Sequence, residues 1–147
     1  MLARFRAVDT RAWVPGLLWG ALAYGVHKYG AVVGFYLEYP WFQNLTHAAS
    51  ASGVAILVGL LGLELGYRGR RLLAFVVGVT AAAAVGWEVI EYLGWLDRFG
   101  VYLMFHDLND AMVDMASNSV GVTLALAALW WRTGLTPASE GGAGSLR

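Results

Sequence analysis

One helical face of the chain carries polar side chains at the head of a long apolar run, in the segment HDLNDAMVDMASNSVG followed by VTLALAALWW. The stripe consists of Asp107, Asp110, Asp114, Asn118 and Gly121. These positions recur every three or four residues, the spacing that aligns side chains along one face of a helix. We therefore expect the stripe to face other helices rather than solvent or lipid.

Two further acidic residues and two histidines lie in other apolar segments of the chain. Glu88 and Glu91 are three residues apart and share a helix face, while His27 and His47 lie in earlier segments. Carboxylate oxygens together with imidazole nitrogens suit a divalent metal such as Mg, Mn, Fe or Zn. The predicted ligands are His47, Glu88, Glu91, Asp110 and Asp114, with Asn118, Asp107 and His27 as residues that orient them. No catalytic residue is predicted.

Simpler roles are open for several of these residues. Asp107 could cap a helix, and Asp110 could favour the positive end of the helix dipole. Glu88 and Glu91 could pair with Arg98. His27 and His47 could be ordinary histidines of a membrane interface.

Composition identifies a membrane protein. The 147 residues are 59% hydrophobic and 14% charged, and their mean hydropathy is +0.57. A soluble domain carries about 25% charged residues, and a chain this short could not bury so much apolar surface in one core. The net charge is zero, which gives no reason to expect nucleic acid as a partner. Cysteine is absent, which excludes thiolate catalysis, thiolate metal ligands and disulfides.

The elements that would position the polar residues are four apolar segments, each long enough to cross a membrane. They cover about residues 13–37, 45–67, 72–96 and 107–131. The first apolar run is too long for a cleaved signal peptide, so we expect it to remain as a span. Residues 1–132 would form an all-α, four-helix transmembrane domain, and the Gly- and Ser-rich residues 133–147 a disordered cytoplasmic tail. Lys and Arg gather before the first span, between the second and third, and after the fourth, which predicts that both termini are cytoplasmic.

This topology brings the polar residues to one depth of the membrane, in its outer half. An acidic or basic residue at the centre of a membrane helix costs about 2.5–3.5 kcal/mol, and neighbouring carboxylates also repel one another. Lys28 and Arg98 are the only Lys and Arg expected near this layer. Two cationic side chains cannot neutralise five carboxylates, so a divalent metal ion could supply the remaining positive charge.

The motifs GWEVIEYL and DLNDAMVDMASNSVG resemble those of the YjdF-type inner-membrane family, whose function is unknown. The resemblance covers Trp87, Glu88 and Glu91, then Asp110, Asp114, Asn118 and Gly121, with His47 in an earlier helix. It implies a polytopic membrane protein with an acidic motif inside the membrane, and it implies no particular reaction. Members of that family are often longer than this chain.

Three functions are compatible with these residues. The first is a membrane metalloenzyme that acts on lipid or lipid-linked substrates. The second is a proton- or cation-coupled transporter or channel, although the inner half of the bundle lacks the polar groups of a relay. The third is a non-catalytic scaffold subunit.

Location and partners follow from the same features. We expect a multi-pass protein of the cell (inner or plasma) membrane, in contact with membrane lipids. Pairs of glycines four residues apart predict close helix packing, and they leave a homo-oligomer possible through the same faces. The pairs are Gly16 and Gly20, Gly30 and Gly34, and Gly62 and Gly66.

Overall fold

The computed structural model describes residues 10–92 and 108–133, and every element in these two ranges is an α-helix. The helices are α1 (Thr10–Val32), α2 (Phe35–Glu38), α3 (Pro40–Glu64), α4 (Gly69–Tyr92) and α5 (Leu108–Thr133). The predicted all-α class is therefore confirmed for these ranges. Most of the predicted tail, and the end of the third predicted span, lie outside the described residues.

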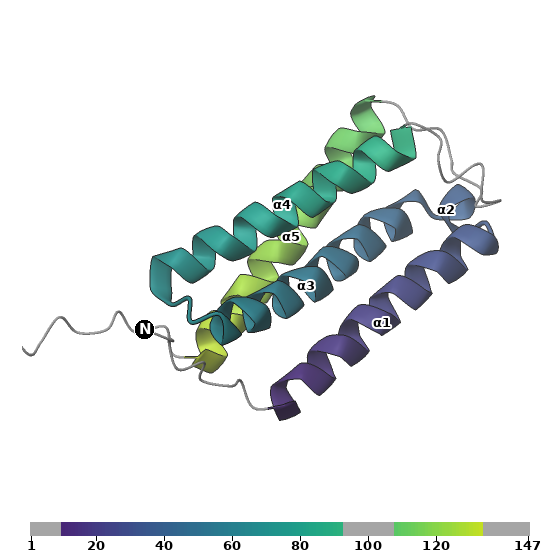
Figure 1. Cartoon of the computed structure of the whole chain (residues 1–147). Coiled ribbons are helices and arrows are strands. Elements are labelled where there is room, and N and C mark those ends of the chain that lie inside the picture. Colours follow the sequence, from purple (N-terminus) through teal and green to yellow (C-terminus); the bar gives the residue numbers. More distant parts are fainter. Residues whose placement is uncertain (1–9, 93–107, 134–147) are drawn as a thin grey trace, which may run out of the picture.

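The four long helices run side by side and alternate in direction (Figure 1). α3 is the central helix, since it packs against α1, α4 and α5, whereas α1 and α4 lie on opposite sides of it. The end of α1, the start of α3, the end of α4 and the start of α5 meet at one end of the bundle, beside α2 (Figure 1). We call this the α2 end.

The first predicted span is interrupted, which corrects the expectation of one helix as far as Leu37. α1 ends at Val32, and Gly34 adopts a left-handed conformation with φ 75°, which glycine tolerates because it has no Cβ. The single turn of α2 follows, and α3 then begins at Pro40 rather than near residue 45. Proline is favoured at this position because the first helical turn needs no amide hydrogen there.

Three of the described helices are long and apolar enough to cross a membrane. They are Pro40–Glu64, Gly69–Ile90 and Asn109–Trp131 within α3, α4 and α5. α1 is not among them, because its polar residues, such as His27 and Lys28, lower its mean hydropathy. The chain is thus an all-helical membrane protein with at least three candidate spans.

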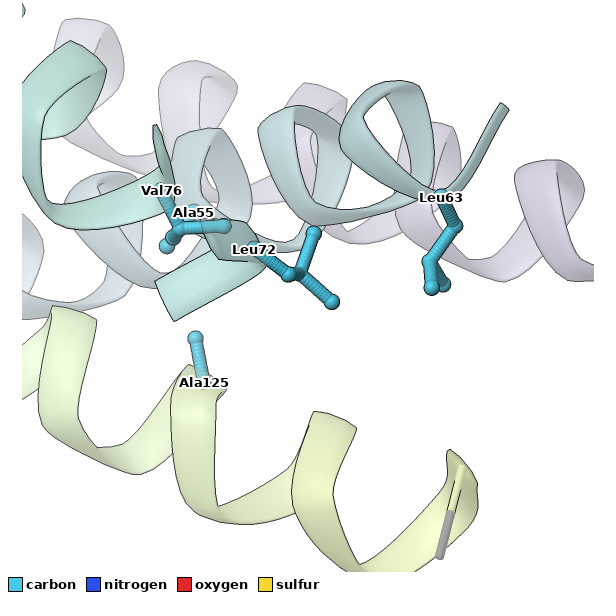
Figure 2. Close-up of a cluster of buried hydrophobic side chains, with 5 residues drawn as sticks. All are labelled: Ala55, Leu63, Leu72, Val76 and Ala125. Carbon is cyan, nitrogen blue, oxygen red and sulfur yellow. The ribbon is translucent and has the colours of Figure 1, made fainter. Parts of the chain in front are cut away.

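An apolar core joins α3, α4 and α5 away from the α2 end. Its buried members are Ala55, Leu63, Leu72, Val76 and Ala125 (Figure 2). Small side chains dominate the middle of this cluster, so the three backbones approach closely.

At least one member of each predicted glycine pair packs closely against another part of the chain, whereas Gly34 and Gly66 adopt positive φ angles at turns. A Cβ atom at Gly16 would lie 3.2 Å from Ile56 of α3, and one at Gly62 would lie 2.6 Å from Leu72 of α4. A Cβ atom on Gly53 of α3 would lie 3.0 Å from the Cα atom of Gly20, so α1 and α3 meet at backbone distance. These faces already serve packing between helices of one chain, and a homo-oligomer through them stays a prediction.

Candidate functional site

His47, Glu88 and Asp114 converge at the α2 end of the bundle, from α3, α4 and α5 respectively. One possible ligand atom of each lies within 4.8 Å of the other two. Nε2 of His47 is 3.4 Å from Oδ2 of Asp114. Each residue sits a turn or two from the end of its helix, which is why three separate segments deliver side chains to one point.

Asp114 is fully buried, and one of its two oxygens has no partner in the described part of the chain. Nε2 of Gln43 donates a hydrogen bond of 3.1 Å to Oδ2 of Asp114, which leaves Oδ1 unpaired. Oε1 of Glu88 is likewise a buried oxygen without a hydrogen-bond partner there. An unsatisfied buried polar group costs about 1–3 kcal/mol, and more when it is charged. Protons on the carboxyl groups or a bound cation could satisfy these two oxygens.

The remaining predicted acidic residues occupy different positions. Asp110 lies in the first turn of α5, half-buried, and it is close enough to repel both Asp114 and Glu88 electrostatically. Glu91 falls three residues after Glu88 in α4, but its side chain is outside the described part of the structure. Asp107 precedes α5 and lies outside the described residues.

His27 lies beside His47, with ring centroids 5.6 Å apart in an edge-on arrangement. The hydroxyl of Tyr36, from α2, contacts Nδ1 of His27 at 2.9 Å, and it donates to the carbonyl oxygen of His27 at 2.8 Å. The Thr46 hydroxyl lies 3.1 Å from the same Tyr36 oxygen, and it donates to the carbonyl oxygen of Gln43 at 2.8 Å. Which atom donates between Tyr36 and Nδ1 of His27 depends on the tautomer of the imidazole.

Asn118 lies one turn after Asp114 on α5 and is buried, as the stripe predicts. Together with His27 and His47 it lines a cavity of about 440 Å³ to which all four long helices contribute residues. The cavity begins at the polar cluster and continues between mainly apolar walls, including Val54, Val77 and Leu126. Three of the predicted site residues, His27, His47 and Asn118, therefore line a space that could hold a ligand, whereas Glu88 and Asp114 are not among its lining residues.

The triad fits a metal ion in donor type and nearly in distance. Ligand atoms bound at about 2.0–2.2 Å to one ion lie at most about 4.4 Å apart, so a pair of atoms at the 4.8 Å limit would have to approach by about 0.4 Å or more. One imidazole and two carboxylates match Zn, Fe or Mn better than Mg, which prefers oxygen ligands alone. Gln43 would orient the Asp114 carboxylate, as hydrogen-bonding partners of metal ligands commonly do.

Sequence reasoning missed three of the residues that build this region, namely Tyr36, Gln43 and Thr46. Gln43 precedes His47 by one helical turn, and this spacing would have revealed it if the start of α3 had been placed at Pro40. Tyr36 had no such signal, because its position depends on the break at Gly34.

The fold and this cluster define a helical membrane protein with a His/Glu/Asp group that could hold a metal ion. Comparison of the sequence with protein families gives one match, over residues 1–134, to a family described as "Predicted membrane protein (DUF2238)". The match covers most of the chain, so the protein belongs to this family. The membership is compatible with the resemblance to YjdF-type proteins. No curated protein and no solved structure matches the chain significantly.

Proposed function

We propose that this protein is a membrane metalloenzyme that holds one divalent cation between His47, Glu88 and Asp114 and hydrolyses a lipid phosphate ester. The observation that carries the proposal is the convergence of these three side chains with two buried carboxylate oxygens that lack partners in the described residues. A cation there would bind both oxygens and offset the negative charge of the two carboxylates. It would also polarise a phosphoryl oxygen or activate water, the usual contribution of a metal ion to hydrolysis.

The proposal places four spans in the cell (inner or plasma) membrane, with both termini in the cytoplasm. α1 supports this count, because its 23 residues extend about 34 Å, enough for the hydrocarbon core. Its apolar side chains Leu17, Leu18 and Leu22 are more than half exposed, as a face toward lipid would be. The α2 end, with the metal site, would then face away from the cytoplasm.

The topology can be tested with single cysteines, since the chain has none of its own. In intact cells, a membrane-impermeant maleimide should label Glu38→Cys at the α2 end and leave Arg70→Cys at the opposite end unlabelled. Labelling of Arg70→Cys alone would reverse the proposed orientation.

An ion or proton channel is less well supported by the same structure. A permeation path needs polar groups along the whole bundle. Beyond the site, however, Ala55, Val76 and Ala125 are almost completely buried against one another (Figure 2). Buried Thr80 directs its hydroxyl to the carbonyl oxygen of Val76 in its own helix, at 2.6 Å. Among the described helices, packed side chains therefore close the bundle beyond the site, which suits an enzyme that takes its substrate from the membrane better than a channel.

Phosphate release from long-chain lipid phosphates, measured with the purified protein in detergent, tests the proposed activity. Protein loaded with Zn, Mn or Fe should release inorganic phosphate, whereas Asp114→Asn and Glu88→Gln should lose that activity. Glu38→Gln, which changes an exposed carboxylate outside the cluster, should retain it. Equal rates in Asp114→Asn and the unaltered protein would refute the proposal.

A further inference from the structure

The cavity beside the cluster of His47, Glu88 and Asp114 has a polar end and an apolar remainder. His27, His47, Trp87 and Asn118 line it near the cluster. From Trp87 to Val77 of α4 the lining extends over ten residues, or about 15 Å along the helix. Beyond the polar end the walls consist mainly of alanine, valine and leucine, with hydroxyls of Thr80 and Thr123. A ligand that matches this gradient has a polar head and a hydrocarbon chain.

The cavity opens toward the side of the bundle. Several of its lining residues are substantially exposed, including Val54 at 40% and Val77 at 45%. α1 and α4 lie on opposite sides of α3 and do not pack against each other in the described part of the chain (Figure 1). In a membrane protein, such a flank faces hydrocarbon, so a lipid chain could enter without crossing water.

A cation marks the polar end of this opening. Nζ of Lys28 on α1 lies 5.4 Å from the centre of the Trp87 ring on α4, and 5.6 Å from that of Tyr24. Lys28 does not line the cavity itself, but it contacts two rings that do, Tyr24 of α1 and Trp87 of α4. A half-buried ammonium group at this place would attract an anionic head group.

From this arrangement we propose that the cavity is the substrate subsite for a membrane lipid with one hydrocarbon chain and a phosphate head group. The chain lies along α4 between Ala84 and Val77, where about 10.5 Å accommodates roughly eight carbon atoms in extended form. The phosphate lies at the Lys28 end, within reach of the metal cluster. This inference rests on the proposed function for the role of the metal, but the chain subsite itself requires no metal.

Photolabelling of the full chain in maltoside detergent tests the subsite. The probe is a long-chain alkyl phosphate with a diazirine in its chain, compared with the alkyl alcohol of the same length. Labelled residues, identified by mass spectrometry, should fall on the cavity-lining parts of α3 and α4. Ala84→Phe should reduce the labelling by about tenfold or more, equivalent to about 1.4 kcal/mol of binding free energy.

Matched controls separate loss of the subsite from loss of the fold. Ala82→Phe makes the same change on the same helix at an exposed position outside the cavity lining, and it should label like the unaltered protein. If Ala84→Phe does not fold, Val77→Phe and its control Val79→Phe repeat the comparison, since Val77 lines the cavity and Val79 does not. Equal labelling in both members of the folded pair would overturn the inference.

Two further experiments test the proposed phosphate head group and the role of the metal. Lys28→Met should reduce labelling by the phosphate probe and leave labelling by the alcohol unchanged, and an equal effect on both probes would contradict the phosphate assignment. Removal of metal with a chelator should leave the chain-directed labelling by the alcohol in place. If no metal binds but labelling remains specific to the cavity, the proposed hydrolase fails and the lipid subsite stands.

Discussion

Gly121 of α5 rests directly on the backbone of α3, because a Cβ atom at this position would overlap the carbonyl oxygen of Ala48. Ala48 follows His47 in the sequence, and Asp114 lies two helical turns before Gly121. The close approach of these two backbones therefore determines how far Asp114 stands from His47. Glycine at position 121 of the polar stripe therefore allows α5 to approach α3 at backbone distance.

Gly121→Ala should push α5 away from α3 and separate the metal ligands. Overpacking of a tight interface costs about 1–3 kcal/mol, so we expect a lower unfolding temperature in detergent together with a lower metal content. The matched control is Gly78→Ala, because a Cβ atom there would meet nothing within 4 Å. If Gly121→Ala retains both stability and metal, the contact between α3 and α5 does not hold the site together.

Gln43 should govern metal affinity without being a ligand, through its hydrogen bond of 3.1 Å to Asp114. Gln43→Met keeps the size of the side chain but removes the donor, and we expect metal affinity to fall by about 10–100-fold. Ser52→Ala serves as the control, since Ser52 accepts a hydrogen bond from Trp19, away from the cluster. Metal titration of the purified variants measures the difference. An unchanged affinity in Gln43→Met would show that Gln43 does not orient the carboxylate.

The network around His27 should contribute to stability more than to metal content. Tyr36→Phe removes the hydroxyl that contacts His27 and Thr46, and a hydrogen bond contributes about 0.5–1.5 kcal/mol net to the free energy of unfolding. Tyr39→Phe is the control, because its hydroxyl bonds Glu38 at an exposed position and its loss should change stability by less than about 0.5 kcal/mol. Equal stabilities of the two variants in chemical denaturation would contradict this role of Tyr36.

The charge balance of His47, Glu88 and Asp114 predicts that Glu88→Gln changes the stability of the protein in a direction that depends on whether metal is bound. In metal-free protein, Glu88→Gln removes repulsion between Glu88 and Asp114, so the variant should be more stable than the unaltered chain. With saturating metal the order should reverse, since ligand at 100 times its Kd stabilises the unaltered protein by about 2.7 kcal/mol. Thermal unfolding with and without metal measures both orders. A stability difference of the same sign in both conditions would argue against a cation at Glu88.

Some of this arrangement was predictable from the sequence because helical periodicity and membrane depth are local properties. The spacing of Asp114 and Asn118 predicted one inward face, and both residues are buried. Counting residues along spans that cross the membrane in alternating directions predicted that His47 and Glu88 would lie at the same depth of the membrane. The structure brings both residues close to Asp114. That this group binds metal stays a prediction.

Other parts were not predictable, because they depend on how the helices pack. A continuous apolar run gave no sign that Gly34 would adopt φ 75° and turn Tyr36 back toward His27. The cavity depends on the separation of α1 and α4 across α3, which hydropathy does not encode. Gln43 is the intermediate case, since Pro40 carried a helix-start signal that the predicted boundary near Leu45 overlooked.

The central claim is that His47, Glu88 and Asp114 hold one divalent cation, and metal analysis of the purified protein tests it most directly. Protein purified in detergent without chelator, then reconstituted with Zn, Mn or Fe, should contain about one metal ion per chain by mass spectrometry. Asp114→Asn should contain far less while keeping its helical circular dichroism, and Glu38→Gln should match the unaltered chain. Absence of metal from the unaltered protein after reconstitution, or full metal content in Asp114→Asn, would contradict the account.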